Sequence, residues 1–200
     1  MADDSIIPLF PLHTVLFPGG PLPLRIFEAR YTDMVGRCMR GQLPFGVLMI
    51  EEGEEGGEVT TTAAVGCGAR IVDFGTLPDG LLGISCIGER RFRVQRAWRE
   101  PDGLDMGAVE WMPPGAAVAL PREYSRLAAV VRRALGELED HYQHAERHYD
   151  DADWVGNRLA ELLPIELADK QALLELQDPL ARLAALMTMV PGEESGESAS

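Results

Sequence analysis

Lysine, long apolar runs and cysteine are scarce in this chain of 200 residues. All but one of its 18 basic residues are arginine, so Lys170 is the only candidate for a lysine base, a Schiff base or a phosphate-binding lysine. No apolar run approaches the roughly 20 residues that span a bilayer, and no basic start leads into an apolar leader. We therefore expect a soluble cytoplasmic protein that contacts no membrane, and the arginine-rich composition favours a bacterial origin.

The three cysteines are Cys38, Cys67 and Cys86, an odd number with no C-x-x-C pair and with apolar neighbours. This pattern argues against a disulfide framework and against a zinc ribbon. Nothing adjacent to Cys67 or Cys86 would lower a thiol pKa. We expect small buried thiols in a reducing compartment rather than nucleophiles.

Basic charge is also in deficit, because 32 acidic residues face 18 basic ones and the net charge is −14. Such a balance disfavours binding to phosphate backbones. One segment, Arg90 to Arg99, nevertheless mixes arginine with aromatics, as nucleic-acid readers do. On a strand, its side chains separate into an apolar face and a charged face: Phe92, Val94 and Trp98 against Arg91, Arg93 and Arg99. We therefore expect an internal role for these arginines, with the acidic run 51–58 as counter-charge, and no nucleic-acid partner.

Strands dominate the expected first half. Apolar segments at 6–12 and 22–27 are broken by prolines, with a Pro-Gly-Gly turn between them. Helical spacing then sets in at 28–41, where Tyr31, Met34, Val35 and Cys38 share one face. Further strands are predicted at 43–50, 63–75, 81–98 and 104–112, a tight turn at 77–80, and a mobile acidic loop at 51–58.

Helices dominate the expected second half. A long one runs from Pro121 to about His148, and a second starts at Asp151 or Asp153 and stops at Pro164. A third lies around 173–176 and a fourth at 178–190, followed by a disordered tail at 191–200. The chain is thus predicted to be α+β, with a β-rich lobe over 5–115 and a helical lobe over 120–190.

The order of several motifs is informative although each motif alone is soft. They are "PLFPLHTVLFPGGPLPLRIFEARYTDMV", "FGVLMI", "VGCGARIVDF", "DGLLGISCIGERRFRV" and "LAELLPIELADKQALLELQDPLARLAALM". In this order they resemble the LON substrate-binding domain, the amino-terminal domain of Lon proteases, over about Ile6 to Val190. The resemblance implies a small, partly open β-barrel lobe with one helix, then a helical-bundle lobe. It also implies recognition of polypeptides, with any chemistry done elsewhere.

The sequence shows no motif for two features that larger relatives of this domain carry. A full-length Lon protease continues into ATPase and serine-lysine peptidase modules, and no G-x-x-x-x-G-K-[ST] loop occurs here. Cereblon carries a zinc domain, and this chain has no C-x-x-C pair. We therefore expect neither cofactor nor metal, and we assign no catalytic, cofactor-binding or metal-binding residue.

Local candidates each have an architectural interpretation. Glu28 and Arg30 can form a functional ion pair, but a carboxylate in a first helical turn is stabilised by the dipole. Phe10, Phe17 and Phe27 can brace extended segments, and any that is exposed would form a sticky contact surface. Ser85 in "GISCIG" misses the G-x-S-x-G elbow by one residue and lies in a strand pattern.

The histidines of the predicted long helix are the sharpest local signal. His141, His144 and His148 would share one face of a continuous helix, with Glu137 nearby, and could bind a metal. The alternative is a solvated polar helix end, which the surrounding charges favour.

Two functions follow. The first is a non-enzymatic polypeptide-binding or adaptor module for unfolded or degron-bearing segments, acting alone or with a separate protease. The second is a small hydrolase or metal-dependent enzyme, with His13, the histidine face or carboxylates converging at the lobe boundary.

Overall fold

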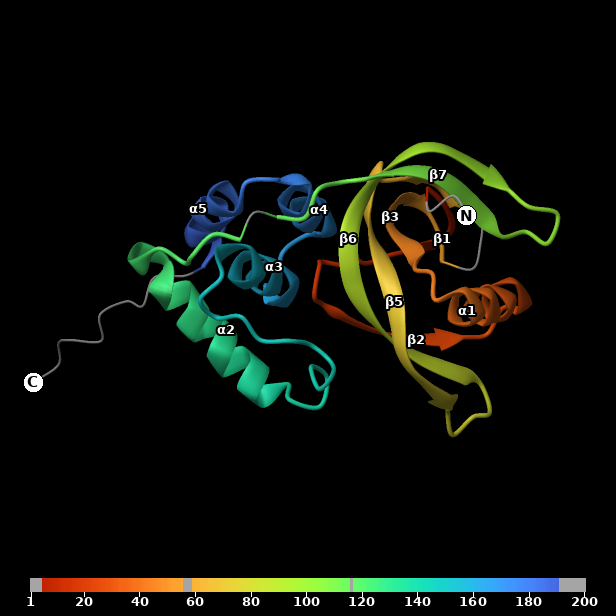
Figure 1. Cartoon of the computed structure of the whole chain (residues 1–200), viewed down its shortest axis with the longest axis horizontal. Helices are drawn as coiled ribbons and strands as arrows, with labels where there is room; N and C mark the ends of the chain where they lie inside the picture. Colours follow the sequence, from red (N-terminus) through yellow and green to blue (C-terminus); the bar gives the residue numbers. More distant parts are fainter. Residues whose placement is uncertain (1–4, 56–58, 116, 191–200) are drawn as a thin grey trace, which may run out of the picture.

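The computed structural model describes residues 5–55, 59–115 and 117–190. Strands occupy most of the first part of the chain and helices the second (Figure 1). The strands are β1 Ile6–Leu12, β2 Pro21–Ile26, β3 Phe45–Gly53, β4 Val59–Thr62, β5 Val65–Thr76, β6 Leu82–Arg99 and β7 Asp105–Trp111. The helices are α1 Ala29–Gly41, α2 Ser125–Glu137, α3 Ala152–Leu162, α4 Leu167–Glu175 and α5 Pro179–Met189, with a 3-10 turn at Arg122–Tyr124.

The strands form one sheet in the order β1-β7-β6-β5-β3-β4, with β2 added on β6. Its pairings are antiparallel except for that of β1 with β3, which is parallel. Because β1 pairs with both β7 and β3, the path of hydrogen-bonded neighbours returns to its start. The fold is therefore mixed α/β on a largely antiparallel sheet.

The distal parts of β5 and β6 form a β-hairpin arm, which extends past the point where β5 pairs with β3. Along this arm, β2 pairs with the edge of β6 that faces away from β5 (Figure 1). The predicted turn at its tip is confirmed, since the Gly80 N–H donates to Leu77 O at 2.9 Å. Gly80 has φ of +86°, a conformation that side chains disfavour. The arm and β2 thus form a three-stranded surface.

The apolar core has two main parts. The predicted face of α1, from Tyr31 to Cys38, packs on strand residues such as Phe45 and Ile84. The larger cluster joins α2, α3, α4 and α5 to the sheet through residues such as Met49 and Val65. The β-rich and helical halves therefore share a core, and β7 and the helices that follow lie on either side of the boundary predicted at 115–120.

Two predictions about polar segments need correction. The helix expected to reach His148 ends at Glu137 and gives way to turns. Tyr142 explains the break, because it leaves the helical path and is buried at 3 % exposure. The acidic loop is also shorter than predicted, since β3 extends through Gly53; its residues 56–58 and the predicted tail at 191–200 lie outside the described residues.

Within the described residues, the longest helices are too short or too polar to cross a membrane.

Candidate functional site

A groove follows the outer side of β2. Three adjoining hollows of about 410, 100 and 460 Å³ have Pro23 in common and lead from the hairpin arm to the segment after α2. Their linings supply the residues by which we define this β2 groove: Pro21, Pro23, Phe74, Ser85, Leu138 and His141. Volumes of this size suit a few side chains of a ligand.

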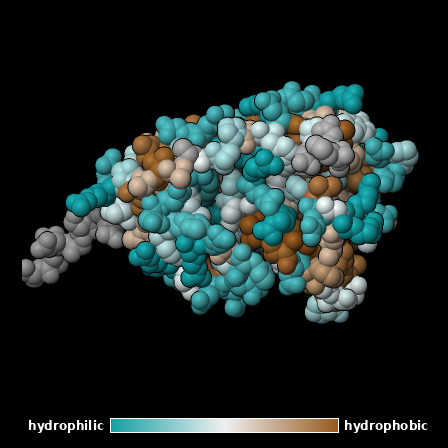
Figure 2. All heavy atoms as spheres, viewed as in Figure 1, coloured by the Kyte–Doolittle hydropathy of each residue, from teal (hydrophilic) through white to brown (hydrophobic). Residues whose placement is uncertain are grey.

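Large apolar side chains remain exposed beside this groove. Phe74 on β5 is 58 % exposed and Leu138 after α2 is 43 % exposed. On the other side of β2, Phe27 is 67 % exposed and lines a further hollow of about 240 Å³. Figure 2 shows hydrophobic surface over β2 and the hairpin arm, bordered by hydrophilic surface. Exposed apolar surface that gathers in one place is typical of contact surfaces.

The free edge of β2 is poor in hydrogen-bond donors. The Gly88 N–H donates to Gly20 O at 2.8 Å, and in an antiparallel pair every second residue bonds to the partner strand. The backbone N–H and C=O groups of the even-numbered residues of β2 therefore point toward β6. The backbone nitrogens of Pro21 and Pro23 therefore lie on the free edge of β2, and neither carries a hydrogen to donate. Prolines on an edge discourage the addition of another strand.

The free edge of the arm on β5 is blunted as well. The pairing of β5 with β6 has an irregularity between Ile71 and Asp73, which disturbs the ladder. One residue on, Phe74 N–H donates to the Asp73 carboxylate at 2.9 Å. The backbone of this edge is thus partly satisfied from within the chain.

A polar cluster fixes the end of the groove nearest the helices. Tyr142 donates its hydroxyl hydrogen to the Glu161 carboxylate, which also lies 3.2 Å from Arg158 Nη1. Arg158 Nη2 donates to Pro18 O at 2.8 Å and so ties α3 to the loop before β2. Burial and the neighbouring Glu161 raise the pKa of Tyr142, so its hydroxyl remains a donor. Lys170 donates to Glu161 O at 2.7 Å, and burial lowers the pKa of its ammonium group.

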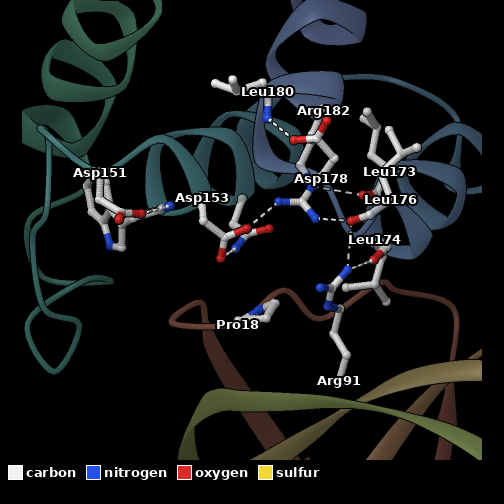
Figure 3. Close-up of polar contacts among 12 residues, drawn as sticks. Pro18, Arg91, Asp151, Asp153, Leu173, Leu174, Leu176, Asp178, Leu180 and Arg182 are labelled. Atoms are coloured by element: carbon white, nitrogen blue, oxygen red, sulfur yellow. Dashed lines mark hydrogen bonds and ion pairs between the residues drawn. The ribbon is translucent and has the colours of Figure 1, made fainter. Parts of the chain in front are cut away.

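A second polar network joins the helices to β6 (Figure 3). Arg91 Nη1 donates to Leu174 O at 2.8 Å and to Leu176 O at 2.7 Å. Arg182 lies 2.6 Å from the Asp153 carboxylate and also donates to Leu176 O. Burial lowers the pKa of Arg91, although its two carbonyl acceptors favour the charged form.

The prediction that Arg91 lies on an outward, charged face of β6 is therefore wrong, because Arg91 is only 5 % exposed and points toward α4. The other two arginines of that face, Arg93 and Arg99, are exposed as predicted. Arg99 pairs with Asp105 at 2.8 Å.

The predicted histidine set does not converge. His141 and His144 line the β2 groove, whereas His148 pairs with Glu146 at 3.1 Å. Glu137 lies at the end of α2 and is exposed. Among the described residues, no group of three or more His, Cys, Asp or Glu side chains is arranged to hold a metal ion.

Among the other candidates from the sequence, Ser85 and Cys86 line the same hollow as His141 and His144. His13 is exposed, and its backbone N–H donates to the Glu55 carboxylate. Ser85 lies within β6, half-buried, with no strand-to-helix turn around it. Burial raises the pKa of the Cys67 and Cys86 thiols to about 12, as their predicted inert role requires.

The start of α1 combines both interpretations of Glu28 and Arg30. Glu28 occupies the N-cap position without a side-chain cap, and Arg30 lies 2.7 Å from its carboxylate. Arg30 also donates to Gly103 O at 2.9 Å, which ties α1 to the turn between β6 and β7. Phe10 and Phe17 are buried as braces, and Phe27 is the exposed one.

A further hollow of about 460 Å³ lies beside β1 and the distal part of β6. Its aromatic residue Trp98 already donates to Glu100 at 2.9 Å, and Arg99 and Asp105 on its rim form an ion pair. The β2 groove is the stronger candidate, because the exposed apolar side chains of Phe74 and Leu138 line it.

Comparisons with known proteins agree with this geometry. Residues 6–191 match the family model described as the ATP-dependent protease La (LON) substrate-binding domain. The chain is 25 % identical over 194 residues to a Lon protease of Cytophaga hutchinsonii and 29 % identical over 201 residues to one of Paraburkholderia phytofirmans. These alignments cover 93 % and 96 % of this chain, but only 24 % and 25 % of the relatives.

Two solved structures are similar over most of their length. A Lon N-terminal domain protein from Xanthomonas campestris has a TM-score of 0.78 and 41 % identity, covering 94 % of this chain and 99 % of that one. The N-terminal domain of a Mycobacterium avium complex Lon protease has a TM-score of 0.61 and 19 % identity, covering 92 % and 96 %. The second supports the fold alone.

Proposed function

Because the chain belongs to the LON substrate-binding domain family, we propose that it binds unfolded or degron-bearing polypeptide segments in the β2 groove without transforming them. The observation that carries the proposal is the exposed apolar lining of this groove, above all Phe74 and Leu138. Apolar side chains of a ligand would complement this lining, and an unfolded segment exposes more of them than a folded protein does.

The mode of binding follows from the blunted edges. Pro21, Pro23 and the Asp73 carboxylate leave few backbone donors for an added strand. The ligand is therefore held by its side chains in successive hollows rather than by a continuous ladder. Such contacts are tolerant of sequence, as a receptor for many unfolded segments requires.

We also infer how the architecture serves this role. The closed path of strands forms a small, partly open barrel in the lobe 5–115, and residues 120–190 form a helical lobe beside it. Arg158 and Arg91 bridge the two through Pro18 and Leu174, and so fix the width of the groove between them. Ligand enters a site that is formed in advance, which limits the entropy lost on binding.

The role beyond binding is part of the proposal. The chain spans about a quarter of the length of the Lon proteases it matches. We propose that this domain retains polypeptides in the cytoplasm and presents them to a protease. The hydrolase alternative is not favoured, because Ser85, which shares a hollow with His141 and His144, lies within β6 and not at a strand-to-helix turn.

Binding is tested with a reduced and carboxymethylated protein, which stays unfolded, against its native form. Fluorescence anisotropy should show binding of the unfolded form only. Leu138→Ser or Phe74→Ser should weaken binding about tenfold, as expected when one apolar anchor is lost. The matched control is Leu180→Ser on α5, where a leucine of similar exposure, 36 %, lies outside the groove. Equal affinity of all variants would refute the groove assignment.

A further inference from the structure

Acidic side chains border the β2 groove. Asp73 lies at the hairpin end and Asp140 beside the loop after α2, and both are exposed. The loop that carries Asp140 is strongly acidic, since residues 137–151 hold six carboxylates and one arginine. The chain as a whole has a net charge of −14.

The basic groups of the groove are already engaged. Arg25 pairs with Asp79 at the hairpin turn. Arg158 is fully buried, where it pairs with Glu161 at 3.2 Å and donates to Pro18 O. A ligand therefore meets carboxylates at the rim without an equivalent supply of free cations among the described groove residues.

We propose that the β2 groove selects polypeptide segments in which apolar residues are flanked by lysine or arginine, and rejects segments flanked by aspartate or glutamate. This inference rests on the proposed function and adds the chemical class of the ligand. Its basis is charge complementarity, with apolar anchors in the hollows and cations at the acidic rim.

The size of the effect follows from solvent exposure. Each exposed ion pair changes Kd by at most about fivefold, so selection requires several contacts acting together. Two rim carboxylates and the acidic loop acting together therefore give on the order of tenfold between cationic and anionic flanks at low salt. Screening shortens the range of these interactions to about 3 Å at 1 M salt, and the selection then fades. A second copy of this chain is disfavoured as occupant, because both copies carry a net charge of −14.

The test uses three fluorescein-labelled peptides with one apolar core, flanked by lysine, serine or glutamate. At 25 mM salt, the lysine-flanked peptide should bind about tenfold tighter than the glutamate-flanked one. At 1 M salt the two should differ less than about twofold. The double variant Asp73→Asn/Asp140→Asn should reduce the low-salt ratio severalfold. The control Asp33→Asn/Asp169→Asn removes two charges from exposed positions on α1 and α4, and should preserve the ratio.

The outcomes separate the two proposals. Equal binding of all three peptides overturns the charge selection and leaves the proposed function standing, whereas failure of all three to bind overturns the proposed function itself. Tightest binding of the glutamate-flanked peptide, or a ratio lost only in the control, overturns the charge assignment. A micromolar dimer in sedimentation velocity that disappears in Leu138→Ser assigns the groove to a second copy and also overturns it.

Discussion

Buried arginines hold the helices against each other and against the sheet. Arg158 and Arg182 have no exposed surface, and Arg91 has little. In the sequence, the two helical arginines interrupt apolar stretches, "WVGNRLAELL" and "PLARLAALM", where the helical period would have placed them in the core. The sequence thus predicts that both arginines are buried, but the carbonyls and carboxylates that bind their guanidinium groups come from other elements. Sequence patterns locate such a residue without revealing its partner.

Arg182 offers a test of this interpretation. Its removal leaves the Asp153 carboxylate without its cation and the Leu173 carbonyl without the Arg182 donor, whereas Leu176 O keeps the donor from Arg91. Arg182→Met should lower the free energy of unfolding by about 3–5 kcal/mol in chemical denaturation, as breaking a buried pair does. Arg133→Met, at an exposed position on α2, should change it by less than about 0.5 kcal/mol. A loss below about 1 kcal/mol in Arg182→Met would contradict a buried structural pair.

The buried thiols predict a weakening of the fold in alkali. Burial raises the pKa of Cys67 and Cys86 to about 12, above the 9.0 of an exposed thiol. Between these values the unfolded chain loses protons that the native chain keeps, so stability is fully present below pH 9 and falls as the pH rises to 12. Each thiol contributes a slope of about 1.4 kcal/mol per pH unit.

Urea unfolding at pH 8 and pH 10.5 measures this effect. Cys67→Ala should lower stability at both values because it leaves a small void, yet the fall between the two pH values should be smaller than in the parent. An unchanged fall would mean that the Cys67 thiol titrates normally in the native chain.

Helix ends show why some element boundaries are predictable and others are not. The second helix was expected to start at Asp151 or Asp153 and the fourth at 178, and the structure shows that Asp151 and Asp178 each accept a backbone hydrogen bond at the helix start. The end of α2 at Glu137 has no such local signal, because helical spacing continues through Leu138 and Tyr142. Tertiary packing of Tyr142 against Glu161 decides that boundary, and with it the fate of the predicted histidine face.

The contribution of the Asp151 cap to the free energy of unfolding can be measured directly. Its carboxylate accepts from Trp154 N–H at 2.7 Å, so Asp151→Ala should lower the free energy of unfolding by about 1 kcal/mol. The neighbouring Asp150→Ala is the matched control, since Asp150 contributes its backbone carbonyl to Leu120 N–H and its side chain is exposed. Equal effects in thermal or urea unfolding would show that charge in the loop, not the cap, is responsible.

Strand faces illustrate the limit of simple alternation. Buried and half-buried positions alternate from Ile84 to Cys86, where β6 pairs with β2, but the register shifts between Val94 and Arg96 against β7. An irregularity of this kind moves later side chains to the other face. Arg91 precedes it and is buried for a different reason, the docking of α4 against β6. The face of each residue there depends on neighbours that alternation does not encode.

At the scale of the molecule, the order of the elements was predictable because each carries its own period, cap or turn. The β2 groove was not, since it combines Pro21 and Pro23 of one segment with Ser85 of β6 and Leu138 of the loop after α2. The exposure of Phe27 was foreseen only as a conditional contact surface. Long-range packing, which brings these segments together, leaves no local trace in the sequence.

The shared core predicts that the β-rich and helical halves unfold together. The main apolar cluster runs from Leu159 in α3 to Met49 and Val65 in the strands, so neither half keeps its core alone. Variants that retain only Trp111 on β7 or only Trp154 on α3 report on each half by fluorescence.

Within each of these variants, the fluorescence and far-UV circular dichroism midpoints should coincide in urea. Arg91→Met removes a polar bridge between the halves but leaves the apolar cluster, so it should lower both midpoints together rather than separate them. A strand probe that unfolds at a different urea concentration from the helical signal would show that the two halves are independent lobes. In that case the groove between them would have a variable width, and the ligand would have to close it.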